Sequence, residues 1–577
     1  MGMAGGRLTE YMDWDDLYAR ILTGARDEAL SRALWLMTGA IWNPRIAGMA
    51  IRVVGKWFAT AFGGAILGAV MVLGYAPFNA FVIPVVALTM FFGLVLAQST
   101  AVRAALAGFS FGLGMFGAGV SWIYISLHTY GGMSPAWAAI ATALFCAMLS
   151  LFPAIFGVAA WHLRHSRHAV HVWSLPALWV ATEWLRGVGV TGFPWLAVGY
   201  SQMPGSPLAG YAPVAGVYGI SALVAVTAGA LLHLRALDSR GRGIAMVLAS
   251  AIWAFGALLQ SVIWTTPVGA PYPVALLQGN ISQEKKWAVG QAAVTLDTYL
   301  SLLKSSVGQL IVMPETALPT FSDQLPDAYR SAMAAHVISR NADLVMGLVE
   351  RESKGERLHY YNSAVSIGAS PSQTYRKQHL VPFGEYIPAK PLLGWVSSVL
   401  KIPFADMSPG TAASSSLDLQ GAKVAVNICF ENAFGEEILD ALPEATVLVN
   451  MSNLAWFGKS LALPQHVQIS QMRAAEIGRY MLSATNTGYT AIINERGHIM
   501  RRAPGHEALV LTGDAQGFEG ATPYVRFGNI PVVMFAIMGI IVGVINVARA
   551  HRRSPSSLNA GTNARASQRR GAGPGKE

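Results

Sequence analysis

The chain has 577 residues, of which 53% are apolar and 12% charged, and its mean hydropathy is +0.42. This composition excludes an ordinary soluble globular protein and indicates an integral membrane protein with room for an extramembrane domain. The net charge is +10, but residues 266–527 hold 20 Lys and Arg against 22 Asp and Glu, so the excess lies elsewhere and no basic face for nucleic acid is expected.

Residues 1–57 mix charges of both signs, and we expect a cytoplasmic extension there. Eight apolar segments of spanning length follow, at 58–74, 78–97, 104–127, 135–161, 170–187, 208–234, 244–265 and 529–548. They predict a seven-helix transmembrane domain at 58–265, an extramembrane domain at 266–527 and a last transmembrane helix at 528–548.

Lys and Arg occur only in every second connection between these segments. The stretch before the first segment and the second, fourth and sixth connections contain them, whereas the first, third and fifth contain none. Because cytoplasmic loops carry an excess of positive charge, both termini are expected in the cytoplasm and residues 266–527 on the outer face. The basic, polar tail at 549–577 is expected to be disordered.

The extramembrane part alternates strand-like runs with helical segments. Expected strands are 273–280, 309–316, 342–350, 362–368, 423–431, 445–453, 481–487 and 490–500, the last with a turn at Asn494–Gly497. A helix is expected at 466–481, with Arg473, Glu476 and Arg479 on its polar face. This alternation predicts a layered α/β domain. It contains no nucleotide-binding glycine pattern, and His379 and His466 lack the spacing of metal ligands, so no cofactor and no metal is expected.

Cys429 ends the apolar run 423–431, and the only other cysteine, Cys146, lies far away in a predicted span. A disulfide is therefore not expected, and Cys429 is a candidate nucleophile. The alternative is that it packs as a small buried residue. Cys146 is expected to pack in the fourth span.

Two further reactive side chains follow predicted strands, Glu315 and Lys377. A carboxylate can accept the thiol proton, a thiolate can attack a carbonyl carbon, and an ammonium can stabilise the resulting oxyanion. The three side chains together therefore suit acyl transfer. Taken singly, Glu315 and Lys377 also fit solvated loop residues.

Longer motifs sharpen this interpretation. They are GFPWLAVGYSQ at 192–202, HLVPFGEYIP at 379–388, NMSNLAWFGKS at 450–460, ATNTGYTA at 484–491 and TPYVRFGN at 522–529. With the order Glu315, Lys377, Cys429 and the seven-plus-one spans, residues 58–548 resemble the apolipoprotein N-acyltransferase family, membrane-anchored members of the nitrilase superfamily. The resemblance implies an αββα sandwich on the periplasmic side of a bacterial inner membrane.

The resemblance also implies the reaction. An acyl chain would pass from a phospholipid to Cys429 as a thioester, and then to the α-amine of the diacylglyceryl-cysteine of an apolipoprotein. By the resemblance Glu315 is the general base, Lys377 the oxyanion stabiliser and Cys429 the nucleophile, with Glu385 supporting the triad or forming a structural ion pair. No cofactor is implied, and a monomer is expected.

Substrate contacts are implied for residues around this triad. Phe430 and Glu431 flank the nucleophile, Trp287 lies near the pocket mouth, and Trp195 and Tyr200 line the entrance; plain packing is the alternative for the aromatic rings. The family usually has tyrosine at Phe430 and aspartate at Leu454, so neither the phenolic hydroxyl nor that carboxylate is available here.

Two more features are assigned from composition. The apolar segment 389–404 suits an arm in the bilayer or a lid over the acyl chain, with a buried helix as alternative. Glu183 and Arg186 share a helical face within a span and suit an ion pair or a headgroup contact.

Two other functions remain open from the residues alone. One is a membrane-tethered amidase or nitrilase-type hydrolase that uses the same triad with water as acceptor. The other is a lipid-binding or transport protein with an inactive outer domain.

Overall fold

The computed structural model describes residues 44–164, 168–189, 192–234, 237–286, 288, 290–355, 357–394, 406–411 and 416–553. The chain divides into two units between Thr60 and Ala61. Some predicted features lie outside the described residues: the extension before residue 44, Trp287, residues 395–404 of the apolar segment, and the tail after residue 553.

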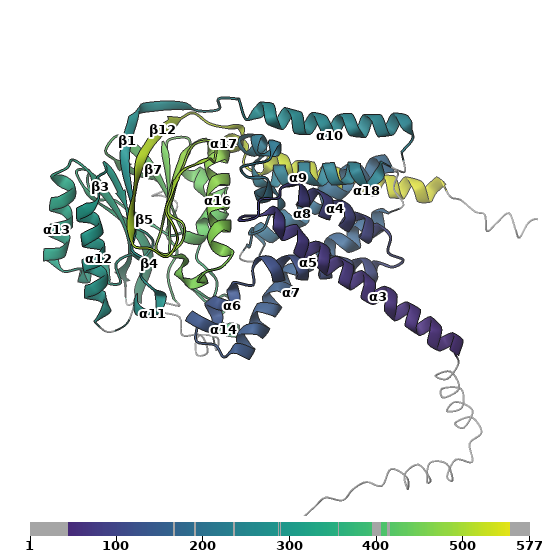
Figure 1. Cartoon of the computed structure of the whole chain (residues 1–577), viewed down its shortest axis with the longest axis horizontal. Helices are drawn as coiled ribbons and strands as arrows, with labels where there is room; N and C mark the ends of the chain where they lie inside the picture. The colour runs from purple at the N-terminus through teal and green to yellow at the C-terminus, as the bar shows by residue number, and fades with distance from the viewer. Residues whose placement is uncertain are drawn as a thin grey trace, which may run out of the picture. The chain divides into compact units, whose positions relative to one another are not determined.

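The predicted spanning segments are helical (Figure 1). They are α3 Pro44–Met71 with η1 Val72–Gly74, α4 Val82–Leu96, α5 Ala101–Gly119, α7 Pro135–Leu163, α8 His168–Val188, η4 Pro207–Tyr211 with α9 Ala212–His233, α10 Ser239–Leu259, and α18 Ile530–Arg553. Short helical turns α6 Ile123–Ile125, η2 Ser126–Tyr130 and η3 Val198–Gln202 lie in the connections.

Within the described ranges, six helices are long and apolar enough to cross a membrane. They are α3, α5, α7, α9, α10 and α18. The other two predicted spans are α4, which has 15 residues, and α8, which carries Glu183 and Arg186. Length and composition therefore support six of the eight predicted spans. Cys146 is buried in α7, 4% exposed, and is not in a disulfide, as expected.

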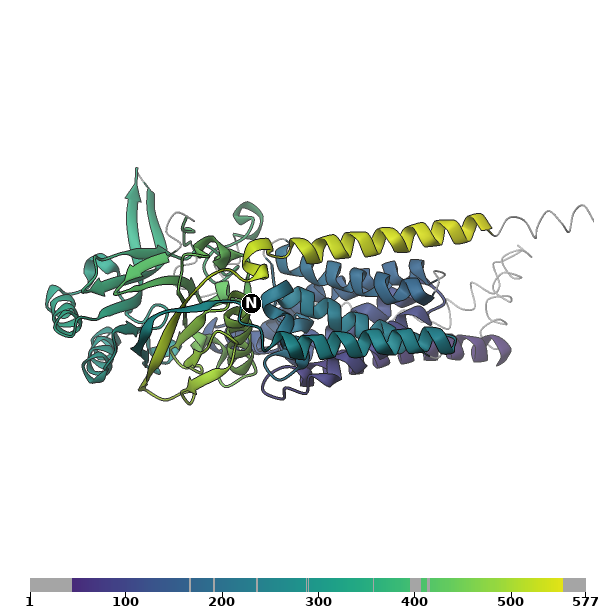
Figure 2. The same ribbon diagram turned by 90° about the horizontal axis from the view of Figure 1, so that it is seen from above.

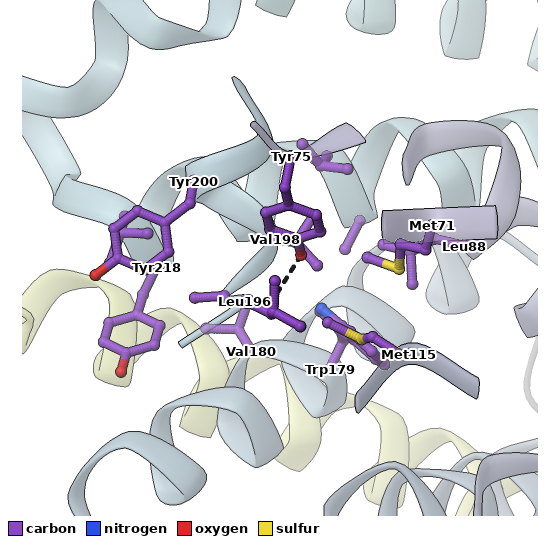
Figure 3. Close-up of a cluster of buried hydrophobic side chains, with 14 of the residues drawn as sticks. Met71, Tyr75, Leu88, Met115, Trp179, Val180, Leu196, Val198, Tyr200 and Tyr218 are labelled. Atoms are coloured by element: carbon purple, nitrogen blue, oxygen red, sulfur yellow. Dashed lines mark hydrogen bonds between the residues drawn. The ribbon is translucent and has the colours of Figure 1, made fainter. Parts of the chain in front are cut away.

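Aromatic side chains fill the core between these helices. Phe91 of α4 stacks on Phe111 of α5 with ring centroids 4.1 Å apart, and Trp179 of α8 meets both rings edge-on. Figure 3 shows the loop after α8 held against this core, because the Tyr75 hydroxyl donates a hydrogen bond of 2.8 Å to the Leu196 carbonyl oxygen. The loop that carries the motif 192–202 is thus part of the helical core.

The remaining chain forms two six-stranded sheets. The first has the order β12-β1-β2-β3-β4-β5, with β1 Thr266–Gln278, β2 Leu310–Val312, β3 Asp343–Lys354, β4 Arg357–Gly368, β5 Thr374–Arg376 and β12 Leu509–Glu519. The second has the order β11-β10-β9-β8-β7-β6, with β6 Ser416–Leu419, β7 Ala422–Ile428, β8 Val447–Ser452, β9 Tyr480–Thr485, β10 Ala491–Ile493 and β11 Ile499–Arg502.

The sheets pack face to face and are covered by helices (Figure 1). Their shared core holds Val274, Leu276, Leu310 and Val345 from the first sheet and Val424, Val426, Val449 and Leu482 from the second. Helices α12 Gln291–Ser305 and α13 Asp327–Ile338 cover the first sheet, and α16 Ala462–Ile477 covers the second. This arrangement is the predicted αββα sandwich.

The sandwich is inserted between α10 and α18. Its first and last strands are antiparallel neighbours, and Thr266 of β1 pairs with Glu519 of β12. A short helix, α17 Pro523–Phe527, then leads from β12 to α18. Figure 2 shows both connections leaving the same end of the sandwich.

Strand boundaries differ from the prediction where polar residues intervene. β7 ends at Ile428, so Cys429 and Glu431 lie in the following helical turn η7 Cys429–Ala433 and not in a strand. The predicted turn at Asn494–Gly497 is confirmed by the hydrogen bond from the Gly497 N–H to the Asn494 carbonyl oxygen. Strands β5, β6 and β12 were not expected, because they are short or largely exposed and have no apolar run.

Helix α16 differs most from the expectation. It begins at Ala462 and ends at Ile477, four residues before each predicted boundary, and its polar face is buried. Arg473 and Glu476 are each at most 1% exposed, because this face lies against the transmembrane helices while the other covers the second sheet. The Glu476 carboxylate accepts a hydrogen bond of 2.7 Å from the Val217 N–H of α9, which joins the two parts.

Candidate active site

Cys429 is the first residue after β7 and begins the turn η7. β7 runs parallel to β8 in the middle of the second sheet, so its carboxyl end presents the residue that follows it. The backbone of Cys429 is left-handed, with φ +56°, which is uncommon for a residue with a side chain. The thiol is partly exposed.

Glu315 lies in the loop after β2, and both of its carboxylate oxygens are bound. Oε1 accepts hydrogen bonds from Asn362 Nδ2 at 2.8 Å and Lys377 Nζ at 3.4 Å. Oε2 accepts one from the backbone N–H of Asn453 at 2.9 Å. The charge of Glu315 also acts on the Cys429 thiol and raises its pKa, so the two side chains lie close together. The structure therefore brings the three predicted catalytic side chains together.

Lys377 follows β5 and is 1% exposed. Its ammonium donates to both oxygens of Glu385, at 3.0 and 2.9 Å, as well as to Glu315. Asn362 of β4 donates to Glu315 and Glu385 at 2.8 Å each and so holds the two carboxylates on either side of the lysine. Asn362 was missed in the sequence because a single asparagine inside a strand carries no recognisable pattern.

The electrostatics of this cluster set its resting protonation. Burial alone would raise the pKa of Glu315, but Lys377 and the hydrogen bonds from Asn362 and Asn453 hold it below its ordinary value. Burial would lower the pKa of Lys377, but Glu385 and Glu315 outweigh this and raise it. Burial, and next the charge of Glu315, raise the pKa of Cys429 well above its ordinary value. The cluster therefore rests as carboxylate, ammonium and thiol.

The Glu431 carboxylate points into the protein. Its carboxylate accepts hydrogen bonds from the backbone N–H groups of Ile428 and Gln378, both at 2.6 Å, and of His379 at 3.1 Å. The Tyr375 hydroxyl donates to it at 3.0 Å. One buried carboxylate thus joins the loop that carries Lys377 to the turn that carries Cys429. Its predicted contact with substrate stays a prediction.

Comparison with known proteins places the chain among its relatives. Residues 67–230 match the family described as the apolipoprotein N-acyltransferase N-terminal domain, and residues 273–524 match the carbon-nitrogen hydrolase family. The apolipoprotein N-acyltransferase of Nitrosomonas europaea is 50% identical over 480 residues, which is 82% of this chain and 95% of the relative. The chain belongs to the apolipoprotein N-acyltransferase family. The apolipoprotein N-acyltransferase of Methylococcus capsulatus is 41% identical over 86% of this chain and 97% of its own length.

These matches confirm the family that the motifs indicated, and they confirm the nitrilase-like fold of residues 273–524. Among solved structures, an amidase from Nesterenkonia sp. is 18% identical and covers 45% of this chain and 94% of its own, with a TM-score of 0.33.

The aromatic candidates lie between the family's two domains. Phe430 contacts Phe434 and His379, with ring centroids 5.0 and 5.7 Å away. Trp195 is 4% exposed, and its indole N–H donates to Gln465 Oε1 of α16 at 2.8 Å. Both Trp195 and Tyr200 are buried against the catalytic domain, so neither lines an open entrance in this conformation. Their contact with substrate stays a prediction.

Glu183 and Arg186 hold the motif loop 192–202 rather than each other. Glu183 Oε1 accepts a hydrogen bond of 2.8 Å from the Val198 N–H. Arg186 Nη1 donates to the carbonyl oxygens of Phe193 and Trp195, the latter at 2.7 Å. Leu454, the other departure from the family pattern, is 1% exposed and packs in the core next to the transmembrane helices.

Proposed function

We propose that this chain is a phospholipid:apolipoprotein N-acyltransferase that works through a thioester on Cys429. The observation that carries the proposal is the convergence of Glu315, Lys377 and Cys429, from three different loops, at one partly buried point. Membership of the family supplies the substrate class. The αββα domain supplies the scaffold for acyl transfer.

In the first half-reaction the Cys429 sulfur attacks the ester carbonyl carbon of a phospholipid while Glu315 accepts the thiol proton. The Lys377 ammonium and backbone N–H groups stabilise the tetrahedral oxyanion. When the intermediate collapses, the C–O bond of the ester breaks, and protonated Glu315 returns the proton to the leaving lysophospholipid oxygen. The acyl chain remains on Cys429 as a thioester.

In the second half-reaction the α-amine of the acceptor's diacylglyceryl-cysteine attacks the thioester carbon. Glu315 accepts the amine proton, and the C–S bond breaks to give an amide and the Cys429 thiolate. The proton then returns from Glu315 to the thiolate, which restores the resting site. Neither half-reaction needs a cofactor, and Glu385 and Asn362 keep Lys377 and Glu315 in place throughout.

A membrane arrangement completes the proposal. Eight spans, seven before the outer domain at 266–527 and one after it, put both termini in the cytoplasm and the catalytic domain in the periplasm of a bacterial inner membrane. The alternation of Lys and Arg among the connections supports this orientation. The protein acts as a monomer, with a membrane phospholipid as donor and an apolipoprotein as acceptor.

The hydrolase alternative differs in what receives the acyl chain. If water were the second acceptor, the thioester would decay to free fatty acid without a lipopeptide. The apolar helices next to the catalytic domain favour a lipid substrate, because a hydrolase of small amides does not need them. An inactive lipid-binding protein would not need a carboxylate, an ammonium and a thiol together in one site.

Mass spectrometry of the full-length protein tests the proposal. After incubation with phospholipid alone, we expect an acyl adduct on Cys429 that persists until a diacylglyceryl-cysteine lipopeptide is added, and then appears on the peptide amine. Prompt release of free fatty acid would establish the hydrolase instead. Absence of any adduct during turnover would refute the thioester mechanism.

The two cysteines provide a matched pair of variants. Cys429→Ala should abolish acyl transfer, because it removes the nucleophile. Cys146→Ala should keep full activity, because that thiol packs inside α7. Equal losses in the two variants would show that the nucleophile is assigned wrongly.

A further inference from the structure

A cavity of about 520 Å³ lies next to the proposed active site, between the helices and the catalytic domain. Its walls come from the ends of α8 and α9, from the loop after Lys377, from the residues after η7, and from Arg473, Tyr524 and Asn529. Its volume is in the range of small-ligand pockets. Cys429 does not line it, and neither half-reaction described above uses it.

Two buried polar atoms in its walls have no partner among the described residues. They are Nε of Arg473, on a side chain that is 1% exposed, and Oδ1 of Asn529, on a residue that is 4% exposed. Buried polar groups are nearly always hydrogen-bonded, and one left unsatisfied costs about 1–3 kcal/mol. Both residues line the cavity, so one donor and one acceptor without partners lie in its walls.

The charges around the cavity decide which ligand fits. The guanidinium of Arg473 is already neutralised, because Glu476 accepts its Nη2–H at 2.9 Å. Glu436 and Glu437 add two carboxylates at the exposed rim, of which Glu437 accepts from His379 Nδ1 at 2.6 Å. A phosphate brings negative charge and no donor for Asn529. A peptide group brings both a C=O and an N–H and carries no charge.

We propose that this cavity binds the peptide that follows the lipidated cysteine of the acceptor. A peptide C=O accepts from Arg473 Nε, a peptide N–H donates to Asn529 Oδ1, and a basic side chain near the cysteine faces Glu436 and Glu437. The inference rests on the proposed function and adds the part of the acceptor that the enzyme recognises beyond the reacting amine.

The position of the cavity relative to Cys429 agrees with this assignment. Its wall includes His379, two residues after Lys377, and Phe434, which follows η7 and stacks on His379 with ring centroids 3.8 Å apart. Phe430, the neighbour of Cys429, contacts both of these rings. These ring contacts connect the wall of the cavity to the neighbour of Cys429, so the cavity lies beside the proposed site of the thioester.

Single-turnover transfer from the acylated full-length enzyme tests the inference. One acceptor is diacylglyceryl-cysteine amide, with no peptide; two others carry a short peptide with Lys or with Glu after the cysteine. We expect KM to be about tenfold lower for the Lys peptide than for the amide, which corresponds to about 1.4 kcal/mol. The Glu peptide should bind less well than the Lys peptide, because it meets Glu436 and Glu437.

Variants show which cavity residues cause the preference among the acceptors. Glu437→Gln should remove most of the Lys-over-Glu preference, and Asn529→Leu should remove most of the advantage of a peptide over the amide. Glu444→Gln is the matched control, since this exposed carboxylate of the same domain does not line the cavity, and the full preference should remain.

The outcomes separate this inference from the proposed function. Equal KM values for all three acceptors, with normal transfer, would refute the peptide site and leave the acyltransferase intact. Dependence of Cys429 acylation on the phospholipid headgroup that disappears in Glu437→Gln would assign the cavity to the donor's headgroup and also refute it. Acylation of Cys429 followed by hydrolysis with every acceptor would refute the acyltransferase itself.

Discussion

At the scale of single residues, the site holds its proton on sulfur until a substrate arrives. Burial raises the pKa of Cys429 most, the charge of Glu315 adds to the rise, and Lys377 lowers it. A thiol kept in this form resists alkylation and oxidation, because the thiolate is the reactive species. The carboxylate that accepts the proton is the same group that keeps it on the thiol at rest.

This arrangement gives Glu315→Gln two opposite effects. Loss of the negative charge lowers the pKa of Cys429, because Lys377 then acts without its counterpart, so alkylation by neutral iodoacetamide at a fixed mildly alkaline pH should become faster. Acylation by phospholipid should fall by about 10²–10⁴-fold, because the general base is lost. Both rates are measured by mass spectrometry in the Cys146→Ala background. Slower alkylation together with slower acylation would contradict the assigned electrostatics.

The sequence was most informative about reactive side chains at strand ends. Glu315, Lys377, Glu385 and Cys429 were all expected, and the structure places the thiol beside the hydrogen-bonded group of the other three. Asn362 and the inward direction of Glu431 were not expected. Their roles depend on which strands and loops lie side by side, and tertiary contacts of this kind leave no local pattern in a sequence.

At the scale of elements, Glu431 joins the end of β5 to the turn after β7. Glu431→Gln should lower the free energy of unfolding by about 1–3 kcal/mol, because the amide cannot accept all the hydrogen bonds that Glu431 accepts and a buried donor left unpaired costs about that much. Tyr375→Phe removes one hydroxyl from the same carboxylate and should cost about 1 kcal/mol. Thermal unfolding of both variants in detergent measures the difference.

The activity of these two variants adds a second measurement. If Glu431 positions the Lys377 loop, Glu431→Gln should slow acylation of Cys429 far more than Tyr375→Phe, because the amide keeps only one accepting oxygen for three backbone N–H groups. Unaltered acylation in Glu431→Gln would mean that the loop and the turn hold their positions without it.

Helix α16 connects the outer domain to the transmembrane helices through buried amides. Gln465 accepts from the indole N–H groups of Trp195 and Trp122, at 2.8 and 3.4 Å, and donates to the Gly119 carbonyl oxygen at 3.2 Å. Gln465→Leu leaves the Trp195 indole N–H unpaired, whereas Trp122 Nε1 still donates to the Gly119 carbonyl oxygen at 3.1 Å, and the variant should lower stability by about 1–3 kcal/mol. Gln324→Leu, at an exposed position on the far sheet's side, should change stability little. Equal melting temperatures for the two variants would contradict the role of Gln465.

A polar helix face usually indicates exposure to solvent, but the polar face of α16 is buried. Its arginine, glutamate and glutamine side chains meet loop carbonyls, backbone N–H groups and indoles of the neighbouring helices. The helical period was visible in the sequence. The second partner, which lies more than 200 residues earlier in the chain, was not.

At the scale of the whole molecule, the proposed orientation of the chain in the membrane can be tested directly. In a Cys146→Ala, Cys429→Ser background, Lys423→Cys in the catalytic domain should react with an impermeant maleimide in intact spheroplasts. Ser99→Cys, in the connection between α4 and α5, should react only after lysis. The reverse pattern would invert the proposed topology.

Hydropathy and charge predicted the order of the helical and catalytic parts because both are averages over many residues. They did not reveal β12, whose side chains are mostly intermediate or exposed and whose only distinguishing feature is its pairing with β1. The closure of the outer domain by its own last strand is therefore a property of the fold that the sequence pattern leaves hidden.

That closure has a consequence for biogenesis. While the chain is being made, β1 pairs with β2 on one side, and its other edge stays open until β12 emerges more than 200 residues later. An open edge is a site of mispairing and aggregation. β12 is followed almost at once by α17 and α18, so the edge is covered at about the time the last helix enters the bilayer. Closure of the sheet and insertion of α18 thus fall together.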